Sequence, residues 1–177
     1  MNTKDIVNIA MFATLLSVCA WIYIPMTIPF TMQTFAVFLA MIVLGGKKGT
    51  IVICIYMLLG ILGVPVFAGG TAGIGVVLGN TGGYMIGWLL MGVIVWLSER
   101  LTNNHKIVQI AAIIIGLVAC YLFGTWWFLN IYTKSNGDAG FWSAFSLCVL
   151  PFVIPDLVKM FLAFSVGKRL QRIIKNV

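Results

Sequence analysis

The sequence predicts an all-α integral membrane protein, a single domain of six membrane-spanning helices over residues 1–177, on the basis of two observations. The first is composition: 62% of the residues are hydrophobic, 8% are charged, and the mean hydropathy is +1.10. A soluble domain of this length has too large a surface to hide so much apolar area. The second is that the apolar residues form continuous runs, which favours helices over a β-barrel as the structure that crosses the bilayer.

Six apolar segments give the expected helices. They cover residues 5–25, 32–46, 49–63, 81–98, 106–127 and 143–171. The first is expected to stay in the mature chain, because Val18 precedes Cys19 where a lipoprotein signal needs a small residue, and because further spans follow. The second and third are shorter than the roughly 20 residues of a perpendicular crossing. Residues 45–49 between them, which are three glycines and two lysines, predict a tight charged turn.

The basic residues fall almost entirely on one side of the expected bundle. Nine of the eleven Lys and Arg residues lie in the terminal segments and in the second and fourth connections: Lys4, Lys47, Lys48, Arg100, Lys106, Lys168, Arg169, Arg172 and Lys175. The other three connections contain only Lys134. Because cytoplasmic segments of membrane proteins are enriched in Lys and Arg, both termini are expected in the cytoplasm. The net charge of +7 therefore indicates membrane topology, and no nucleic-acid partner is expected.

A glycine-rich connection is expected on the outer side. Ten of the nineteen glycines lie between residues 60 and 87, and Asn80, Thr81 and Tyr84 add polar groups among them. Glycine lets a ligand approach backbone N–H groups closely, so a ligand-binding loop that includes Gly70 and Gly83 is one interpretation. A flexible loop, or close helix packing through small residues, is the other. The stretch lacks the Gly-Lys-Ser/Thr ending of a phosphate-binding loop.

Asp156 and Lys159 stand three residues apart in the last segment and therefore share one helix face. Ionisable groups at membrane depth usually face a cavity or a partner, which favours a ligand site. The alternative is a structural ion pair near the interface, with Lys159 extending outward. Pro155 is expected to start a helical turn or to kink a longer helix, because it has no backbone N–H. Gln33, whose amide offers donors and an acceptor, is either a ligand contact or an interfacial helix cap.

Small residues recur along one stripe of the first helix, at Ala10, Ala13, Thr14 and Ser17. Such stripes let two membrane helices approach closely. The stripe therefore predicts a docking surface for a partner subunit, or else close packing within the protein's own bundle.

The sequence contains no apparent catalytic or metal-binding set. His105, the only histidine, lies in a charged connection, where it is expected to be solvated. No His, Cys and carboxylate residues have the spacing of metal ligands, and no nucleophile stands near a base. The four cysteines form no Cys-x-x-Cys pair and are expected to be free thiols. Neither an enzyme nor a bound metal or other cofactor is expected.

Four segments together resemble the BioY family, the biotin-binding S components of energy-coupling factor (ECF) vitamin transporters. They are Pro29-Phe30-Thr31-Met32-Gln33-Thr34, Gly63-Val64-Pro65-Val66-Phe67-Ala68-Gly69-Gly70, Thr81-Gly82-Gly83-Tyr84 and Pro155-Asp156-Leu157-Val158-Lys159. Their order and spacing match over nearly the whole chain. The family usually has proline before its Thr-Gly-Gly-Tyr segment, where this chain has Asn80.

The resemblance implies a six-helix S-component bundle in the bacterial plasma membrane, which binds biotin with high affinity near the outer surface and mediates its uptake. It also implies a transmembrane coupling subunit and cytoplasmic ATPases as partners. On the chemistry of biotin, Asp156 is expected to accept bonds from the ring N–H groups and Lys159 to attract the carboxylate. Tyr84, with Gln33 or Asn80, is expected to complete the pocket. The alternatives are an S component for another vitamin and a small channel or structural membrane protein.

Overall fold

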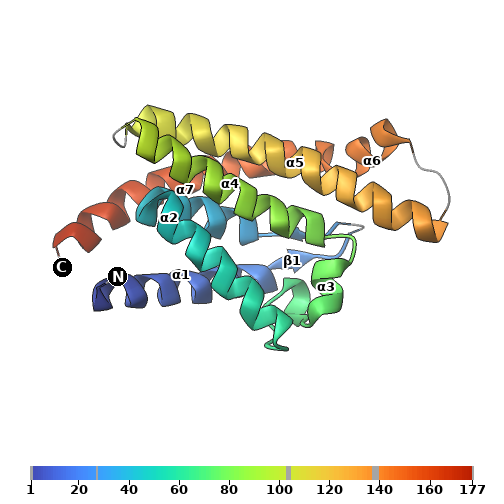
Figure 1. Ribbon diagram of the computed structural model, residues 1–177, viewed down its shortest axis with the longest axis horizontal. Helices are drawn as coiled ribbons and strands as arrows, with labels where there is room; N and C mark the ends of the chain where they lie inside the picture. The colour runs from blue at the N-terminus through green and yellow to red at the C-terminus, as the bar shows by residue number, and fades with distance from the viewer. Residues whose placement is uncertain (1, 27, 103–104, 137–139, 177) are drawn as a thin grey trace.

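The computed structural model describes residues 2–26, 28–102, 105–136 and 140–176, without the side chains of residues 133–136 and 173–176. Most of these residues are helical (Figure 1). The long helices are α1 (Thr3–Trp21), α2 (Gln33–Ile61), α4 (Gly82–Leu101), α5 (Lys106–Asn136) and α7 (Leu150–Asn176). The short elements are β1 (Tyr23–Ile24), β2 (Phe30–Thr31), the 3-10 turn η1 (Ala68–Gly70), α3 (Ile74–Leu78) and α6 (Phe141–Cys148).

The predicted all-α membrane protein is confirmed. Within the described residues, five helical stretches are long and apolar enough to cross a membrane: Thr3–Trp21, Gln33–Ile61, Gly82–Leu101, Lys106–Tyr132 and Phe141–Arg172. The second stretch, α2, is broken sharply in its middle, so the long helical segments number six, as predicted.

The break in α2 lies at Gly45, where φ is 83° and ψ is 169°. The two halves of α2 diverge from this point and run back toward the same end of the molecule (Figure 1). The N–H of Gly46, the first residue of the second half, donates to both carboxylate oxygens of Glu99 at 3.0 and 2.8 Å. A carboxylate at a helix N-terminus is stabilised by the helix dipole. The predicted turn is therefore present but narrower than residues 45–49, because only Gly45 leaves the helical region.

The end of the first helix differs from its prediction. The helix stops at Trp21 instead of residue 25, and the chain then forms a two-stranded antiparallel hairpin that pairs Tyr23 with Thr31 and Ile24 with Phe30. The physical reason is Pro25, because the residue before a proline is driven from the helical to the extended region.

The last predicted helix, 143–171, is divided in two by a break at Val149, where α6 ends and α7 begins. Pro151 explains the break, because it cannot donate the backbone bond that would continue α6. Pro155 lies inside α7 and does not end it. The preceding helix, α5, extends to Asn136 instead of residue 127.

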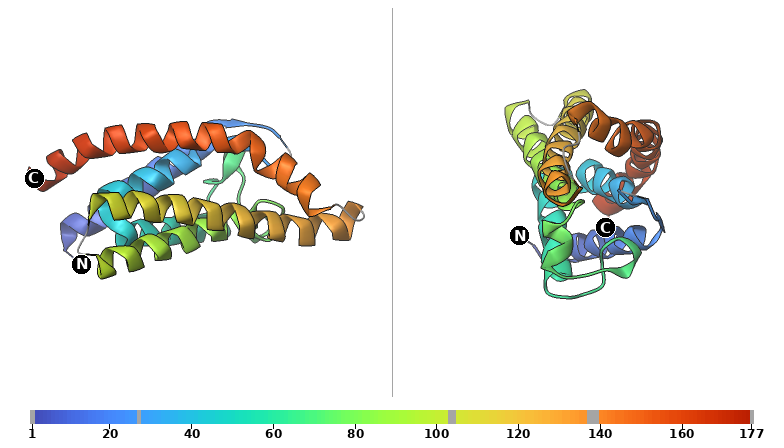
Figure 2. Two further views of the ribbon diagram at one scale, coloured as in Figure 1. Left: turned by 90° about the horizontal axis from the view of Figure 1, so that it is seen from above. Right: turned by 90° about the vertical axis from the view of Figure 1, so that its right-hand side faces the viewer.

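The basic residues predicted on one side lie at one end of the molecule. Both termini, the Gly45 turn and the start of α5 are together there (Figures 1 and 2). Lys48 pairs with Asp5 of α1 at 2.5 Å. Lys47 and Arg100 both lie over the ring of Trp96, at 6.0 and 5.2 Å from its centre. The side chains of Lys134 and Lys175 are outside the described residues.

Close packing of α4 on α5 positions one wall of the site described below. A Cβ on Gly87 would lie 2.6 Å from the Sγ of Cys120, and one on Gly124 would lie 2.3 Å from the ring of Tyr84. Glycine at these two positions lets the helices approach, as small residues do in membrane helix pairs. The interface thereby places Tyr84 and Cys120 between the two helices.

Candidate ligand-binding site

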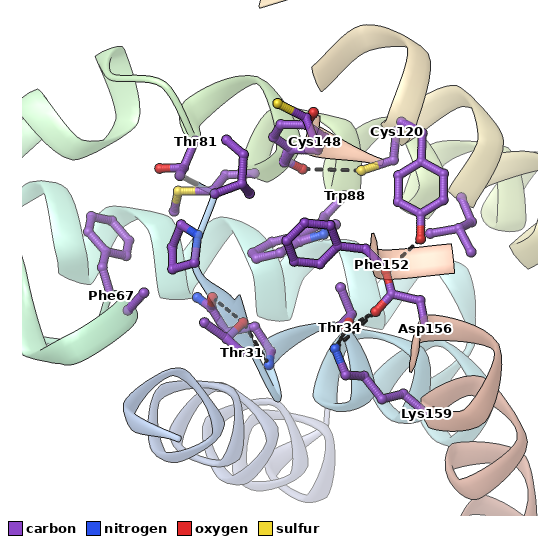
Figure 3. A pocket seen from close by; sticks show the side chains of 18 of the residues that line it. Thr31, Thr34, Phe67, Thr81, Trp88, Cys120, Cys148, Phe152, Asp156 and Lys159 are labelled. Atoms are coloured by element: carbon purple, nitrogen blue, oxygen red, sulfur yellow. Dashed lines mark hydrogen bonds and ion pairs between the residues drawn. The ribbon is translucent and has the colours of Figure 1, made fainter. Parts of the chain in front are cut away.

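A cavity of about 80 Å³ lies beneath the β1–β2 hairpin, toward the end of the bundle away from the termini (Figure 3). Its wall is formed by side chains of the hairpin, the η1 segment and the helices α2–α7. In Figure 3, Asp156, Lys159 and Thr34 lie on one side of the cavity and Phe67 lies on the other. Polar groups are therefore concentrated in parts of a largely apolar wall.

The cover of the cavity consists of two connected segments. The hairpin contributes Ile28, Pro29 and Thr31, and the η1 segment contributes Phe67 and Ala68. The indole N–H of Trp21, beside the hairpin, donates to the carbonyl of Pro65, beside η1, at 2.9 Å. A Cβ on Gly69 would lie only 2.8 Å from the ring of Tyr23, so the two segments also pack directly together.

A buried ion pair forms one side of the cavity. The Nζ of Lys159 lies 3.0 Å from Oδ1 of Asp156, and the two residues are 4% and 2% exposed. The predicted shared helix face is thus confirmed, and the structure does not support the alternative in which Lys159 extends outward. The side chain instead turns inward, with Nζ 4.1 Å from the centre of the Phe30 ring, where a cation–π contact helps to compensate its loss of water.

Two further residues hold the Asp156 carboxylate. Thr34 Oγ1 donates to Oδ1 at 2.8 Å, and Tyr121 Oη donates to Oδ2 at 2.7 Å. Lys159 also donates to Thr34 Oγ1 at 3.0 Å. A carboxylate has about four acceptor positions and an ammonium group three donors. Among the described residues, the side-chain bonds therefore leave about one acceptor position on Asp156 and one donor on Lys159 at the cavity wall.

A second polar group surrounds Gln33, the first residue of α2. Its Oε1 accepts a bond from Thr31 Oγ1 at 2.8 Å, and its Nε2 donates to Tyr56 Oη at 2.5 Å. The Gln33 side chain is buried and lines the cavity, so the structure does not support the interfacial-cap alternative. One amide N–H of Gln33 is left without a described side-chain partner.

Apolar and weakly polar side chains separate these two polar groups. They are Tyr84, Met85, Trp88, Leu117, Cys120, Cys148 and Phe152. Tyr84 lines the cavity as predicted, and its hydroxyl lies 3.3 Å from Thr125 Oγ1. A ligand with polar ends and an apolar middle matches this distribution.

Three residues predicted for the site lie elsewhere. Asn80 and Gly70 are exposed and do not line the cavity. Gly83 is buried against α5, where a Cβ would lie 2.2 Å from the Cβ of Trp127. For Gly83 the structure supports the alternative interpretation, close helix packing. Thr81, next to Asn80, is the residue of this connection that reaches the cavity.

The small-residue stripe of α1 is divided between two faces. Ala13 is buried in the bundle, whereas Ala10 and Thr14 are exposed and Ser17 is half-buried. The expectation that all four form one docking surface is therefore wrong for Ala13. The hydroxyls of Thr14 and Ser17 donate to the carbonyls of Ala10 and Ala13, at 3.0 and 2.9 Å.

Sequence reasoning missed Thr34 and Tyr121. Tyr121 is a polar-tipped residue within the apolar run of α5, and a buried Tyr hydroxyl usually has a partner. The sequence alone does not indicate which residue is the hydrogen-bond partner of the Tyr121 hydroxyl, which the structure shows to be Asp156. Among the described residues no group of three or more His, Cys, Asp or Glu side chains gathers at a site of metal-binding geometry.

The helices and the cavity define a multi-pass α-helical membrane protein with an internal site for a small molecule. The sequence profile of the BioY family matches residues 1–176, and the chain belongs to the BioY family.

Known proteins similar to this chain span almost its whole length. A probable biotin transporter BioY of Pyrococcus horikoshii is 40% identical over 172 residues, which cover 97% of this chain and 98% of that protein. The biotin transporter BioY of Thermotoga maritima is 35% identical over 171 residues, covering 96% and 97%. Biotin transporter BioY2 of Lactococcus lactis is 34% identical over 179 residues, covering 99% and 95%.

A solved structure has the same fold. The crystal structure of an S-component for biotin from an ECF-type ABC transporter matches with a TM-score of 0.82, covering 97% of this chain and 95% of that one, at 23% identity. The predicted S-component-like bundle is confirmed by this match.

Proposed function

We propose that the chain binds biotin in this cavity and is the substrate-binding S component of an ECF biotin transporter in the plasma membrane. Its full-length similarity to proteins named as biotin transporters supports the substrate. The observation in the structure that supports it most directly is the buried Asp156–Lys159 pair in the cavity wall.

The pair suits the ureido ring of biotin. That ring presents an N–H donor beside a carbonyl acceptor, and the pair presents a free acceptor position beside a free donor. Because the Asp156 and Lys159 atoms are 3.0 Å apart, they serve the same end of the ligand. We therefore assign both residues to the ureido ring, in place of the sequence-based assignment of Lys159 to the carboxylate.

The remainder of the cavity suits the remainder of biotin. The fused rings and the aliphatic arm would lie against Phe152 and Trp88, which are buried in the wall. Thr31 and Gln33 supply a hydroxyl and an amide for the polar end of the arm. Tyr84 adds aromatic surface between α4 and α5.

The energy for uptake must come from other subunits. The chain has no phosphate-binding loop, so a transmembrane coupling subunit and cytoplasmic ATPases would supply ATP hydrolysis. We assign no enzymatic step to the chain itself. By the enrichment of Lys and Arg on the cytoplasmic side, the basic end faces the cytoplasm, and the cavity then lies toward the outside.

Calorimetric titration of the purified protein with biotin and with a panel of other vitamins tests the proposal. We expect saturable binding of one biotin per chain. Removing one partner of a buried charged pair typically costs about 2–5 kcal/mol. Asp156→Asn should therefore weaken biotin binding by about 30-fold to several thousand-fold.

The matched control is Asp5→Asn, which removes an acidic partner of an ion pair at the opposite end and should leave biotin binding unchanged. If another vitamin bound more tightly than biotin, that vitamin would be identified as the substrate instead. Lack of saturable binding by any vitamin would favour a channel or structural protein.

A further inference from the structure

The basic end of the molecule has many more cations than acids. Its described acidic residues are Asp5, which pairs with Lys48, and Glu99, which accepts bonds from Gly46 N–H and the Gln109 amide. Among the described residues, no carboxylate lies within ion-pair distance of Lys106, Lys168 or Arg172. These three cations are therefore available to an anion.

The same three cations line one cavity. Lys106 is the first residue of α5, and Lys168, Gln171 and Arg172 belong to the last turns of α7, around a space of about 310 Å³. The Gln171 amide donates to the carbonyl of Ile42 and so holds this part of α7 against α2. The positive end of the α5 dipole adds to the cationic charge. A phosphate group matches such a site in charge and in hydrogen-bonding capacity.

An apolar groove lies on the same pair of helices, nearer the biotin cavity. It has a volume of about 310 Å³. Its lining includes Ile114, Val118 and Leu122 of α5, Phe145 of α6, and Val153 and Leu157 of α7. α5 packs chiefly on α4, and α7 packs chiefly on α2, which leaves a seam between α5 and α7. Both helices follow the long axis of the molecule (Figures 1 and 2).

The distance between the two sites fits a lipid. At about 1.5 Å per residue, Ile114 lies roughly 12 Å along α5 from Lys106, and Leu122 lies roughly 24 Å from it. One leaflet of the hydrocarbon core is about 15 Å thick, half of the roughly 30 Å of the whole core. An acyl chain attached to a headgroup at Lys106 would therefore reach into the groove.

We propose that an anionic phospholipid binds along the seam between α5 and α7, with its phosphate at Lys106, Lys168 and Arg172 and one acyl chain in the apolar groove. The cations alone would accept free phosphate, and the groove alone would accept any apolar chain. Their position on one seam, at the spacing of a headgroup and its chain, identifies a phospholipid as the occupant.

The headgroup contacts are tested by native mass spectrometry of the purified protein titrated with dioleoyl phosphatidylglycerol. The double variant Lys106→Gln with Arg172→Gln should bind this lipid about 30-fold more weakly, since each cation near a lipid surface contributes about a factor of five to affinity. The matched control is Lys47→Gln with Arg169→Gln, which removes the same charge from residues that do not line the cavity. Because salt screens exposed charges that do not contact the phosphate, lipid affinity should change less than about twofold. Dioleoyl phosphatidylcholine should bind wild-type protein much more weakly.

The groove is tested by Val118→Trp, which fills it, against Ile115→Trp, an exposed α5 position outside it. The first should weaken phosphatidylglycerol binding several-fold and the second should not. Thermal unfolding identifies any misfolded variant. If the double variant Lys106→Gln with Arg172→Gln does not fold, the single variant Lys168→Gln is tested in its place.

Four results would overturn the proposal. Equal losses in both charge variants would indicate only general surface attraction. Displacement of the lipid by glycerol 3-phosphate at similar concentration would indicate a free-phosphate site. Unchanged binding in Val118→Trp would remove the acyl-chain contact. Normal lipid binding combined with failure of the Lys106/Arg172 variant to assemble with a coupling subunit would assign the seam to that subunit.

Discussion

At the scale of single residues, the important feature is that other side chains of the protein hold the Asp156–Lys159 pair in place. Thr34 and Tyr121 fix the carboxylate, so the pair meets a ligand in a fixed geometry. Because these two side chains already hold the pair, it loses little further conformational entropy when a ligand binds. This favours high affinity.

The assignment of Lys159 to the ureido ring makes a prediction. Lys159→Met should weaken biotin and biotin amide by similar factors, about 30-fold or more, because both ligands have the same ring. Calorimetric titration of both ligands against wild type and variant measures this. Lys47→Met, at the basic end, is the control and should bind both ligands as wild type does. A much larger loss for biotin than for its amide would return Lys159 to the carboxylate.

Tyr121 is expected to act as a positioning residue for Asp156. Tyr121→Phe keeps the ring but removes the donor to Oδ2, and a buried acceptor that loses its partner costs about 1–3 kcal/mol. The free energy of unfolding should fall by that amount, and biotin should bind more weakly because the carboxylate is no longer held in place. Tyr132→Phe, on the same helix but outside the cavity, should have no effect. If the two variants bind biotin equally well, Tyr121 does not position the carboxylate.

The sequence was sufficient to predict only some of the residues at the cavity. Asp156, Lys159, Gln33 and Tyr84 were recognisable as polar groups in apolar segments or in family motifs, and all four line the cavity. Thr34 and Tyr121 could not be connected to Asp156, because they are 122 and 35 residues away in the chain. Such contacts depend on how α2, α5 and α7 pack, and local patterns do not specify that packing.

At the scale of elements, the break at Gly45 turns one apolar run into two helices. Gly45→Ala should destabilise the protein, because φ 83° with ψ 169° is a backbone conformation essentially limited to glycine, which costs other residues about 1–3 kcal/mol. The new Cβ would also lie 3.2 Å from both carboxylate oxygens of Glu99. We expect the unfolding temperature in detergent to fall by about 2–12 °C.

Gly75→Ala is the control for this change. Its Cβ would have no atom within 4 Å, and its backbone lies in α3, so stability should not fall. An unfolding temperature of Gly45→Ala equal to that of wild type would show that the turn tolerates a side chain.

The errors in predicting the elements have local causes. The sequence predicts a first helix that extends to Pro25 and a last helix that passes through Pro151, whereas regular helix ends at Trp21 and at Cys148, shortly before each proline. The extension of α5 to Asn136 passes through polar residues, which hydropathy alone places in a loop. Composition predicts that a segment enters the membrane, whereas backbone chemistry decides where its helix ends.

At the scale of the whole molecule, the separation of the basic end from the cavity predicts an orientation. In intact cells a membrane-impermeant maleimide should label Thr71→Cys, an exposed residue beside the cavity cover, because we propose that this end faces outward. Ile107→Cys, which is 83% exposed at the basic end, should be labelled only after the membrane is opened. The protein without an introduced cysteine is the control for labelling of the native cysteines. The reverse labelling pattern would invert the proposed topology.

The bond between Trp21 and Pro65 has a kinetic consequence. Two independent flaps over the cavity would offer two routes of entry, whose rate constants would add. Here the hairpin and the η1 segment are linked by that bond and by the contact of Tyr23 with Gly69, so they form a single gate. For a ligand that enters beneath this cover, capture and escape would share one opening motion, and the frequency of that motion would set the residence time.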